Sequence, residues 1–454
     1  MAIRSVYPAT GHEIKSFAAL TAEQIEAKLE LAAQAFRDYA TVPVAHRALC
    51  MHKLAALIDE ETEGLASTMV QEMGKTIGAA RQELAKCANA FRFYADNGER
   101  MMAPEMINTE HGRSYVQWQP LGVILAIMPW NFPFWQVVRF GAPALMAGNI
   151  GLLKHATNVP HCAMAIETLI RRAGFPKGVF QALLIENEQV AGIIADARVA
   201  AVTLTGSGRA GRAVAEVAGK HLKKCVLELG GSDPFIVMPT ADLNAAVQTA
   251  VQARVVNNGQ SCIAAKRFIV HETVYEEFVR RFAQKMESLR IGDPMREDTE
   301  VGPLVSAEAV ETLERQVRDA VAAGGRILTG GSRLVGRGFY FEPTVIADLP
   351  RTSTVYREEL FGPVALVFSA RDVNDAVAIA NDTPFGLGAS LWTRNPAEQQ
   401  QMVSEIEAGM VFLNGMVASD PRLPFGGIKE SGYGRELSAA GMREFMNAKS
   451  IVIA

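Results

Sequence analysis

One of the five cysteines in this chain stands in a context that sets it apart. Cys262 follows Gly259-Gln260-Ser261, a turn-like segment that we expect to lie near a helix end. A thiolate is a strong nucleophile at neutral pH, and nearby backbone N–H groups stabilise it. A lone cysteine is more often a small buried hydrophobe, which is our interpretation of the other four, Cys50, Cys87, Cys162 and Cys225. Cys262 is therefore the candidate nucleophile.

A second candidate, Asn131, lies in Met128-Pro129-Trp130-Asn131-Phe132-Pro133, directly after the apolar run of residues 121–128. Its side-chain amide can donate to a developing oxyanion, and one such donor is typically worth about 3 to 4 kcal/mol. Alternatively, Asn131 caps a helix that starts at Phe132, since Pro133 suits a first helical turn. The two roles are compatible.

A glycine-rich turn precedes a conspicuous glutamate. Residues 206–211 fit the pattern G-x-G-x-x-G between an expected strand and an expected helix, and Glu228 ends the next strand. The usual interpretation places a dinucleotide pyrophosphate on the turn and its ribose on Glu228. Two alternatives are a plain tight turn, or a turn that contacts cofactor while Glu228 does other work.

Composition limits what these residues can serve. The chain has 454 residues, is 49% hydrophobic and carries a net charge of −4, which excludes disorder and argues against nucleic acid or an anionic membrane as the main partner. The few, unclustered cysteines fit a reducing compartment, so we expect a cytoplasmic protein. The eight histidines form no zinc-ligand spacing, and we predict no metal site.

The elements that must position the candidates alternate in type. Helical periodicity covers residues 22–39, 44–58 and 83–94, and a helix is expected over 131–148. From residue 121 onward, strand and helix signals alternate, and a second such series starts near Gly230. This rhythm predicts an α/β fold with doubly wound parallel sheets.

Six segments in order resemble the aldehyde dehydrogenase superfamily, and together they span nearly the whole chain. The resemblance is greatest to the short bacterial forms that oxidise succinate semialdehyde with NAD(P)+. It rests on residues 128–133, Gly206-Ser207, Glu228-Leu229-Gly230-Gly231, 259–262, Glu359-Leu360-Phe361-Gly362-Pro363 and Pro424-Phe425-Gly426-Gly427.

The resemblance implies a mechanism. Cys262 would attack the aldehyde to form a thiohemiacetal, and hydride transfer to nicotinamide would leave a thioester. Asn131 would stabilise the oxyanion together with the backbone N–H of Cys262. Glu228 would be the general base that activates the hydrolytic water, which argues against its ribose-binding role and favours a free acid product over acyl transfer to coenzyme A.

The resemblance also implies the cofactor residues: Trp130, Lys154, Gly206, Ser207, Leu229, Glu359 and Phe361. Many NAD-preferring relatives carry a glutamate three residues after the lysine, where this chain has Thr157. A hydroxyl donates to a 2′-phosphate, whereas a carboxylate repels it. We therefore predict that NADP+ is preferred and that NAD+ is the weaker cofactor.

Substrate recognition is predicted on the helix that follows Asn131. Positions 131, 135 and 139 share one face, which carries Trp135 and Arg139. An arginine in an otherwise apolar tunnel needs an anion, here the substrate carboxylate, with Ser419 as a second donor and Phe425 nearby. The alternative is that Arg139 pairs with a protein carboxylate and is structural.

The resemblance implies three parts: a cofactor-binding domain (1–97 and 121–229), a catalytic domain (230–430) and an oligomerisation element (98–120 and 431–454). A homodimer or homotetramer is expected. Oxidation of succinate semialdehyde is the leading hypothesis. The alternatives are another ω-carboxy aldehyde such as glutarate semialdehyde, a broad aldehyde specificity, or a catalytically silent protein that retains the fold.

Overall fold

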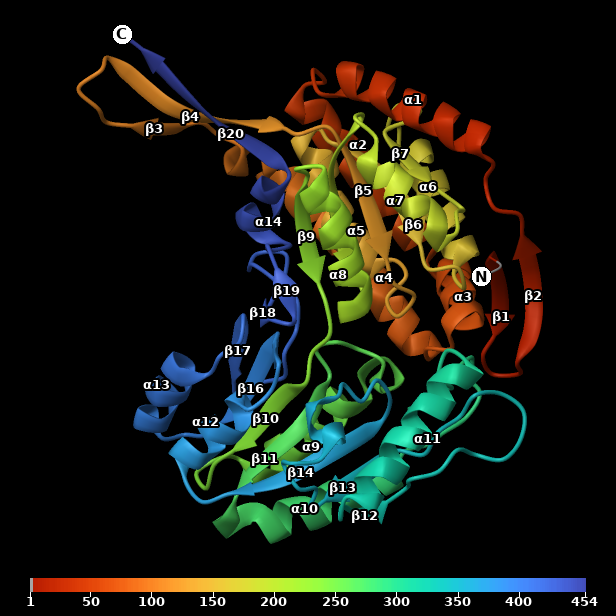
Figure 1. Ribbon diagram of the computed structural model, residues 1–454, viewed down its shortest axis with the longest axis vertical. Coiled ribbons are helices and arrows are strands. Elements are labelled where there is room, and N and C mark those ends of the chain that lie inside the picture. The colour runs from red at the N-terminus through yellow and green to blue at the C-terminus, as the bar shows by residue number, and fades with distance from the viewer. Residues whose placement is uncertain (1–2) are drawn as a thin grey trace.

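Two α/β lobes and a projecting β arm make up the structure (Figure 1), a computed structural model that describes residues 3–454. The first lobe contains a six-stranded sheet in the order β19-β9-β8-β5-β6-β7. All its neighbours are parallel except β19, which runs antiparallel to β9. Its strands are β5 (Val123–Met128), β6 (Ile150–His155), β7 (Phe180–Ala182), β8 (Val199–Thr205), β9 (Lys224–Glu228) and β19 (Gly432–Tyr433).

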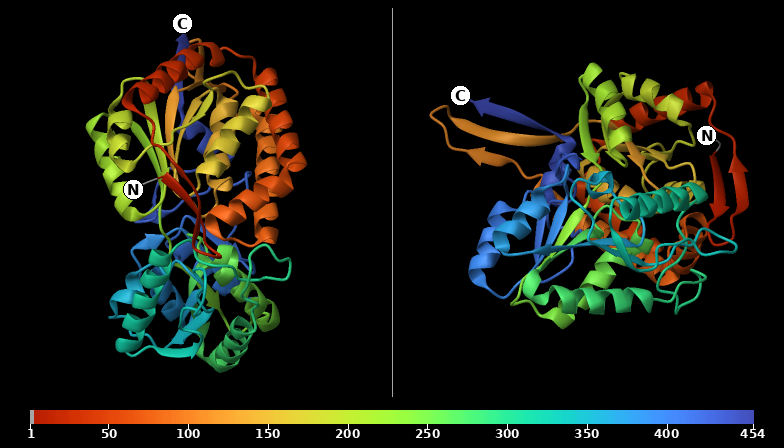
Figure 2. Two further views of the ribbon diagram at one scale, coloured as in Figure 1. Left: turned by 90° about the vertical axis from the view of Figure 1, so that its right-hand side faces the viewer. Right: turned by 60° about the horizontal axis from the view of Figure 1, so that its bottom comes forward.

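Helices pack around this sheet (Figure 2). They are α1 (Ala22–Tyr39), α2 (Val44–Glu60), α3 (Thr62–Met73), α4 (Ile77–Met101), α5 (Trp135–Ala147), α6 (Pro160–Arg172), α7 (Asn187–Ala195) and α8 (Gly208–Lys220), and a hairpin of β1 (Ile3–Tyr7) and β2 (His12–Phe17) lies beside them. The helix expected from residue 131 begins only at Trp135. The Glu83 carboxylate on α4 accepts hydrogen bonds from the backbone N–H groups of Phe134 (2.9 Å) and Trp135 (2.8 Å), so a neighbouring helix satisfies the donors of this N-terminus.

The second lobe contains a seven-stranded sheet in the order β12-β13-β14-β11-β10-β16-β17, in which only β12 is antiparallel. Its strands are β10 (Asp233–Val237), β11 (Ala265–His271), β12 (Arg326–Thr329), β13 (Thr344–Ala347), β14 (Val364–Ala370), β16 (Gly388–Trp392) and β17 (Met410–Leu413). Around it lie α9 (Leu243–Val255), η1 (Val256–Gly259), α10 (Glu272–Glu287), α11 (Ala307–Ala322), η2 (Thr354–Arg357), α12 (Val373–Asn381) and α13 (Pro396–Glu405).

Both faces of the seven-stranded sheet are buried. Phe235 and Val237 of β10 belong to one apolar cluster, whereas Ile236 between them belongs to another. Successive side chains of a strand point to opposite faces, so the two clusters are the cores on either side of the sheet. Burial on both faces is typical of doubly wound α/β folds, and it explains the uninterrupted apolar runs in the sequence.

The arm is a three-stranded antiparallel sheet of β3 (Glu105–Ile107), β4 (Arg113–Pro120) and β20 (Met446–Ile453), which extends away from both lobes (Figure 1). The remaining short elements are β15 (Phe385–Gly386) and β18 (Ile428–Lys429), which pair with each other, and α14 (Ser438–Glu444), which precedes β20. The division into domains predicted from the sequence remains a prediction, with one difference in detail. Residues 432–433, expected in the oligomerisation element, instead extend the six-stranded sheet as β19.

Candidate active site

The site lies where the strand ends of the two lobes face each other. In the first lobe the chain runs outward from β5 to β6 and β7, then returns to the other side of β5 as β8, so the strand order reverses between β5 and β8. Parallel α/β sheets bind ligands at the carboxyl ends of strands at such a reversal. The loops after β5 and β8 carry Trp130, Asn131, Gly206 and Ser207. The second lobe presents the amino ends of β10, β11 and β14, which are adjacent strands.

Two cavities meet at Cys262. The first, of about 300 Å³, contains seven of the residues predicted for cofactor binding and catalysis: Trp130, Asn131, Gly206, Ser207, Cys262, Glu359 and Phe361. The second, of about 190 Å³, contains Cys262 and all four residues predicted for the substrate: Trp135, Arg139, Ser419 and Phe425. Gln136, which was not predicted, lines both cavities. Four predicted residues line neither cavity: Lys154, Thr157, Glu228 and Leu229.

A strained loop carries the cysteine. Asn257 and Asn258 are left-handed (φ 55° and 59°), and Gly259 continues the turn at φ 77°. Left-handed non-glycine residues cost of order 1 to 3 kcal/mol and persist only where contacts hold them. The Asn258 side chain supplies such contacts, since its Nδ2 donates to the backbone oxygens of Gly74 and Pro303, both at 2.9 Å. The loop is therefore held against the first lobe before it reaches Cys262.

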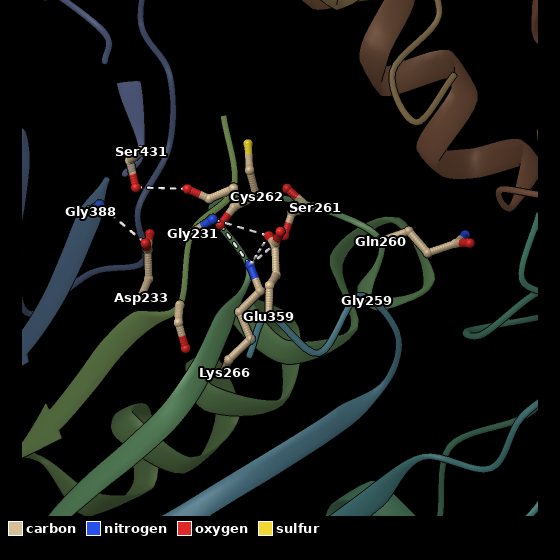
Figure 3. A network of polar contacts seen from close by, with 12 residues as sticks. Gly231, Asp233, Gly259, Gln260, Ser261, Cys262, Lys266, Glu359, Gly388 and Ser431 are labelled. Atoms are coloured by element: carbon tan, nitrogen blue, oxygen red, sulfur yellow. Dashed lines mark hydrogen bonds and ion pairs between the residues drawn. The ribbon is translucent and has the colours of Figure 1, made fainter. Parts of the chain in front are cut away.

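A buried lysine secures the cysteine from behind (Figure 3). Lys266 Nζ donates to the backbone oxygens of Ser261 (2.7 Å) and Cys262 (2.6 Å), and lies 3.3 Å from Glu359 Oε1. Glu359 Oε1 also accepts the backbone N–H of Gly231 at 3.1 Å. The lysine thus joins the nucleophile loop to a carboxylate of the cofactor cavity. This link escaped the sequence analysis because nothing in the spacing of these residues indicates it.

Burial raises the pKa of the Cys262 thiol to about 11, and the nearby Arg139 and Lys266 offset only part of that effect. The sequence interpretation assumed that backbone N–H groups would stabilise a thiolate. In this structure desolvation outweighs every favourable charge, so the thiol is protonated at neutral pH. A base must take its proton for it to act as a nucleophile.

Asn131 is placed to donate a hydrogen bond beside the thiol. Its Nδ2 donates to the backbone oxygen of Gln260 at 3.1 Å, and its own backbone oxygen accepts from Asn257 Nδ2 at 2.7 Å. The second amide N–H is uncommitted among the described residues. Helix α5 has Phe134 as its N-cap, so Asn131 does not cap it.

Glu228 lies behind the cavities rather than in them. It is 2% exposed, and neither of its carboxylate oxygens has a hydrogen-bond partner within residues 3–454. A Cβ on Gly426 would lie 2.5 Å from Glu228 Oε1, so the side chain packs against that glycine. Burial, together with the nearby Glu436, raises the pKa of Glu228 well above its usual range. A rotation of the side chain is needed for this carboxyl to reach Cys262.

The first cavity fits a dinucleotide. The N-terminus of α8, capped by Ser207 Oγ at Ala210 N (3.3 Å), opens toward the Gly206 turn, and helix N-termini bind phosphate. Two buried acceptors on the cavity wall, Asn131 Oδ1 and Gln136 Oε1, lack partners in the part of the chain that the structure describes. Orphaned buried acceptors indicate a polar ligand, because such groups are costly to leave unpaired.

Lys154 and Thr157 follow from strand β6, next to β5 in the sheet. Lys154 is the last residue but one of this strand, and its Nζ donates to Asn187 Oδ1 at 2.9 Å. Thr157 accepts the backbone N–H of Arg4 through its carbonyl, which leaves its hydroxyl free of that contact.

Arg139 has a partner of opposite charge within the protein. Its guanidinium forms an ion pair with the buried Glu436, donates to Thr205 Oγ1 at 3.2 Å and lies 4.2 Å from the centre of the Phe425 ring. The prediction assumed that this charge lacks a protein partner, and that premise is wrong, because Glu436 compensates it. Arg139 still lines the second cavity, but its charge does not require a substrate anion.

One face of α4, which was not predicted to contribute to the site, carries the polar residues Gln82, Glu83 and Lys86 next to Ala79. Ala79, Gln82, Glu83 and Lys86 are spaced at i, i+3, i+4 and i+7, and all four line the second cavity. Glu83 forms an ion pair with the buried Lys75. Polar residues at the spacing of a buried helix face were the available signal, but an ordinary solvent-facing stripe has the same pattern.

A cluster of metal ligands and a membrane-spanning helix are both absent from the described residues. No group of three histidine, cysteine, aspartate or glutamate side chains within residues 3–454 is arranged to hold a metal ion. Over the same residues, no helix is both long and apolar enough to cross a membrane.

Comparison with known proteins agrees with this geometry. The aldehyde dehydrogenase family model matches residues 1–451. Succinate-semialdehyde dehydrogenase [NADP(+)] 1 of Mycobacterium tuberculosis is 53% identical over 100% of both chains, and succinate-semialdehyde dehydrogenase [NADP(+)] of Mycobacterium avium is 50% identical over 100% of this chain and 97% of that one. A crystal structure of succinic semialdehyde dehydrogenase from Streptococcus pyogenes in complex with NADP+ superposes with a TM-score of 0.98, at 36% identity over 100% of both chains. The two cavities meeting at a single cysteine are therefore those of a chain that belongs to the aldehyde dehydrogenase family.

Proposed function

We propose that this protein oxidises succinate semialdehyde to succinate with NADP+ as the preferred cofactor. The observation that carries the proposal is the position of Cys262, where a cavity suited to a dinucleotide meets a smaller one that contains cationic and hydroxyl side chains. The relatives named for this reaction match the chain over its full length at 50 to 53% identity, which supports the same substrate and cofactor here.

The chain's own groups divide the reaction into two stages. Cys262 Sγ attacks the aldehyde carbon after losing its proton, and a C–S bond forms as the carbonyl π bond opens onto oxygen. The second amide N–H of Asn131 and the backbone N–H of Cys262 donate to that oxygen. The bound cofactor supplies the oxidising power by accepting two electrons and the hydrogen of the aldehyde carbon. A thioester on Cys262 remains.

Hydrolysis completes the cycle. Glu228 takes a proton from water, the resulting hydroxide attacks the thioester carbon, and the C–S bond breaks to release succinate and return the Cys262 thiol. One aldehyde, one NADP+ and one water become one carboxylic acid, one NADPH and one proton. Once its side chain rotates out of the buried position that raises its pKa, Glu228 is also the group that we propose as the base for Cys262, whose own raised pKa requires one.

Cofactor choice is proposed to depend on residues at the end of β6 and just after it. Lys154 supplies a positive charge, and no carboxylate stands at position 157 to repel a 2′-phosphate. Trp130 and Phe361 pack edge to face, with ring centres 5.8 Å apart, on the wall of the cofactor cavity. Glu359 on the same wall offers a carboxylate to ribose hydroxyls.

A substrate panel tests the proposal directly. The purified protein is mixed with succinate semialdehyde, glutarate semialdehyde or butanal and either NADP+ or NAD+, and formation of the reduced cofactor is followed by absorbance. We expect the highest kcat/KM with succinate semialdehyde and NADP+, with succinate as the product. A higher value for butanal, or no activity with NADP+, would overturn the assignment.

We also propose that the protein is a homodimer or homotetramer and is cytoplasmic. The arm exposes large apolar side chains, Met106, Ile107, Val452 and Ile453, which a second copy can cover. All five cysteines are free, as is usual in a reducing compartment. Light scattering gives the assembly size, and deletion of residues 446–454 is expected to yield monomers. A wild-type monomer would contradict the assembly proposal.

A further inference from the structure

We infer that Lys86, together with Ser419, is the anchor for the substrate carboxylate and determines the preference for a carboxy aldehyde. The inference rests on the proposed function, because it concerns how the same cavity selects succinate semialdehyde. Lys86 lies on α4, which precedes all the motifs of the cofactor cavity in the sequence. It lines the second cavity together with Cys262. It is a specificity-determining residue rather than a catalytic one.

Two of the charged side chains that line the cavity have partners of opposite charge. Arg139 is paired with Glu436, and Glu83 is paired with Lys75. Lys86 also lines this wall, and it has no carboxylate within ion-pair distance in residues 3–454. The acidic residue next to Ser419, Asp420, is engaged by Arg422 at 2.5 Å. The cavity therefore contains one cation that its own residues leave without a counter-charge.

Ser419 Oγ accepts two hydrogen bonds at the wall of this cavity. Lys86 Nζ donates to Ser419 Oγ at 2.6 Å, and Trp135 Nε1 donates to the same oxygen at 3.1 Å. With both lone pairs of this oxygen occupied, its own proton has no acceptor among the described residues. That O–H and the two remaining N–H bonds of Lys86 are therefore left without a protein acceptor within residues 3–454 at the wall of the cavity.

A carboxylate suits these donors. Lys86 Nζ and Ser419 Oγ lie 2.6 Å apart, each with a donor that lacks an acceptor in the described part of the chain, and the Trp135 ring lies 4.4 Å from Lys86 Nζ and holds the ammonium in place. A carboxylate accepts several such bonds, and bonds to charged groups are the stronger kind. Uncharged aldehydes of similar length cannot use these donors.

Lys86→Met is the primary test, because it keeps the length of the side chain but removes the charge. We expect kcat/KM for succinate semialdehyde to fall about 10- to 100-fold, mostly through KM, whereas kcat/KM for butanal changes less than about threefold. Lys86→Arg is expected to stay within about fivefold of wild type for both aldehydes. The matched control is Lys53→Met, which removes an exposed lysine of α2 and should alter neither aldehyde.

A pH series supplies a readout that a merely structural lysine would not give. Burial lowers the pKa of Lys86 to about 8, an effect enhanced by Arg139 and opposed by Cys87, Glu83 and Asp420. Burial keeps Cys87 a neutral thiol by raising its pKa, and Arg422 keeps Asp420 anionic by lowering its pKa. Lys86 loses its charge above about pH 8, so the ratio of kcat/KM for succinate semialdehyde to that for butanal should fall there. Lys86→Arg should abolish that fall.

The outcomes separate this inference from the proposed function. If wild type prefers succinate semialdehyde but Lys86→Met retains that preference, Lys86 is not the anchor and the proposed function stands. If wild type shows no preference for succinate semialdehyde, the proposed function itself fails. Equal losses for both aldehydes in Lys86→Met, with an unchanged melting temperature, would also overturn the inference, because they indicate a general effect on the site.

Discussion

The two cavities that meet at Cys262 are built in different ways. The cofactor cavity is lined mainly by residues of loops at strand ends, among them Gly206, Gly230 and Ser207, which caps the N-terminus of α8. The substrate cavity is lined mainly by side chains of α4 and α5 and of the loop at residues 416–425. Positions in tight turns accept few residue types, because the backbone there must adopt particular conformations. A wall of side chains changes its chemistry with each substitution.

This difference predicts that the cofactor cavity sets the choice of cofactor and that the substrate cavity sets the choice of aldehyde. Substitutions in the cofactor cavity are expected to affect every aldehyde equally, since each aldehyde meets the same cofactor. Substitutions in the substrate cavity are expected to discriminate between aldehydes. Cys262 lines both cavities and Glu228 lines neither. Substitutions of these two residues are therefore expected to affect the reaction of every aldehyde with either cofactor.

The largest expected effect is loss of the shared residue. Cys262→Ala removes the sulfur that forms the covalent intermediate, so oxidation of every aldehyde should fall by at least about 10⁴-fold. Binding of NADP+, measured by quenching of tryptophan fluorescence, should remain close to wild type. Residual turnover within about tenfold of wild type would show that another group is the nucleophile.

Glu228→Gln should separate the two chemical stages. If Glu228 activates the hydrolytic water, steady turnover should fall about 10²- to 10⁴-fold. A rapid-mixing experiment should then show a burst of about one reduced cofactor per subunit before the slow phase. Steady turnover near the wild-type rate would contradict this role, whereas loss of the burst would indicate that Glu228 also deprotonates Cys262.

Asn131→Ala tests a residue of the cofactor cavity that is proposed to stabilise the oxyanion formed at Cys262. Loss of one oxyanion donor typically costs about 10²- to 10³-fold in kcat. The loss should be the same for succinate semialdehyde and butanal, because the oxyanion forms on the aldehyde oxygen of either substrate. A loss confined to succinate semialdehyde would instead assign Asn131 to carboxylate recognition.

Thr157→Glu should affect the cofactor side alone. A carboxylate at this position would repel a 2′-phosphate, so kcat/KM for NADP+ should fall about 10- to 100-fold more than that for NAD+. The ratio of succinate semialdehyde to butanal should not change. Thr157→Ser is the matched control, because it keeps the hydroxyl. Equal losses with both cofactors would contradict the proposed recognition of the phosphate.

The smallest expected effect concerns stability. The folded-state pKa of Glu228 is raised, so the folded protein holds this proton more strongly than the unfolded chain does. Stability contributed by that proton is present at low pH and is lost as pH rises through the raised pKa. At pH 8, Glu228→Gln should therefore melt about 2 to 4 °C above wild type. The difference should shrink at pH 5, and a variant that melts lower than wild type at pH 8 would contradict the burial argument.

The fold class and most residues of the cofactor cavity were predictable from the amino-acid sequence. Helix α1 has the bounds that its periodicity predicts, and the motifs around Trp130, Gly206 and Glu359 do lie together. Such features are readable because they are local: a turn or a strand end needs particular residues at consecutive positions. The predicted start of α5 is four residues too early, because the carboxylate that accepts its first N–H groups, Glu83, comes from another helix.

The pairing of charges in the substrate cavity, by contrast, can be read only from the folded molecule. Arg139 looked like an unpaired cation in the sequence, but it pairs with Glu436, almost 300 positions away along the chain. Lys86 looked like one more polar residue of a helix, but it donates to Ser419 inside the cavity. Whether a charge is free or compensated depends on which side chains the fold brings within a few ångströms. Spacing along the chain does not contain that information, because electrostatic pairing acts through space.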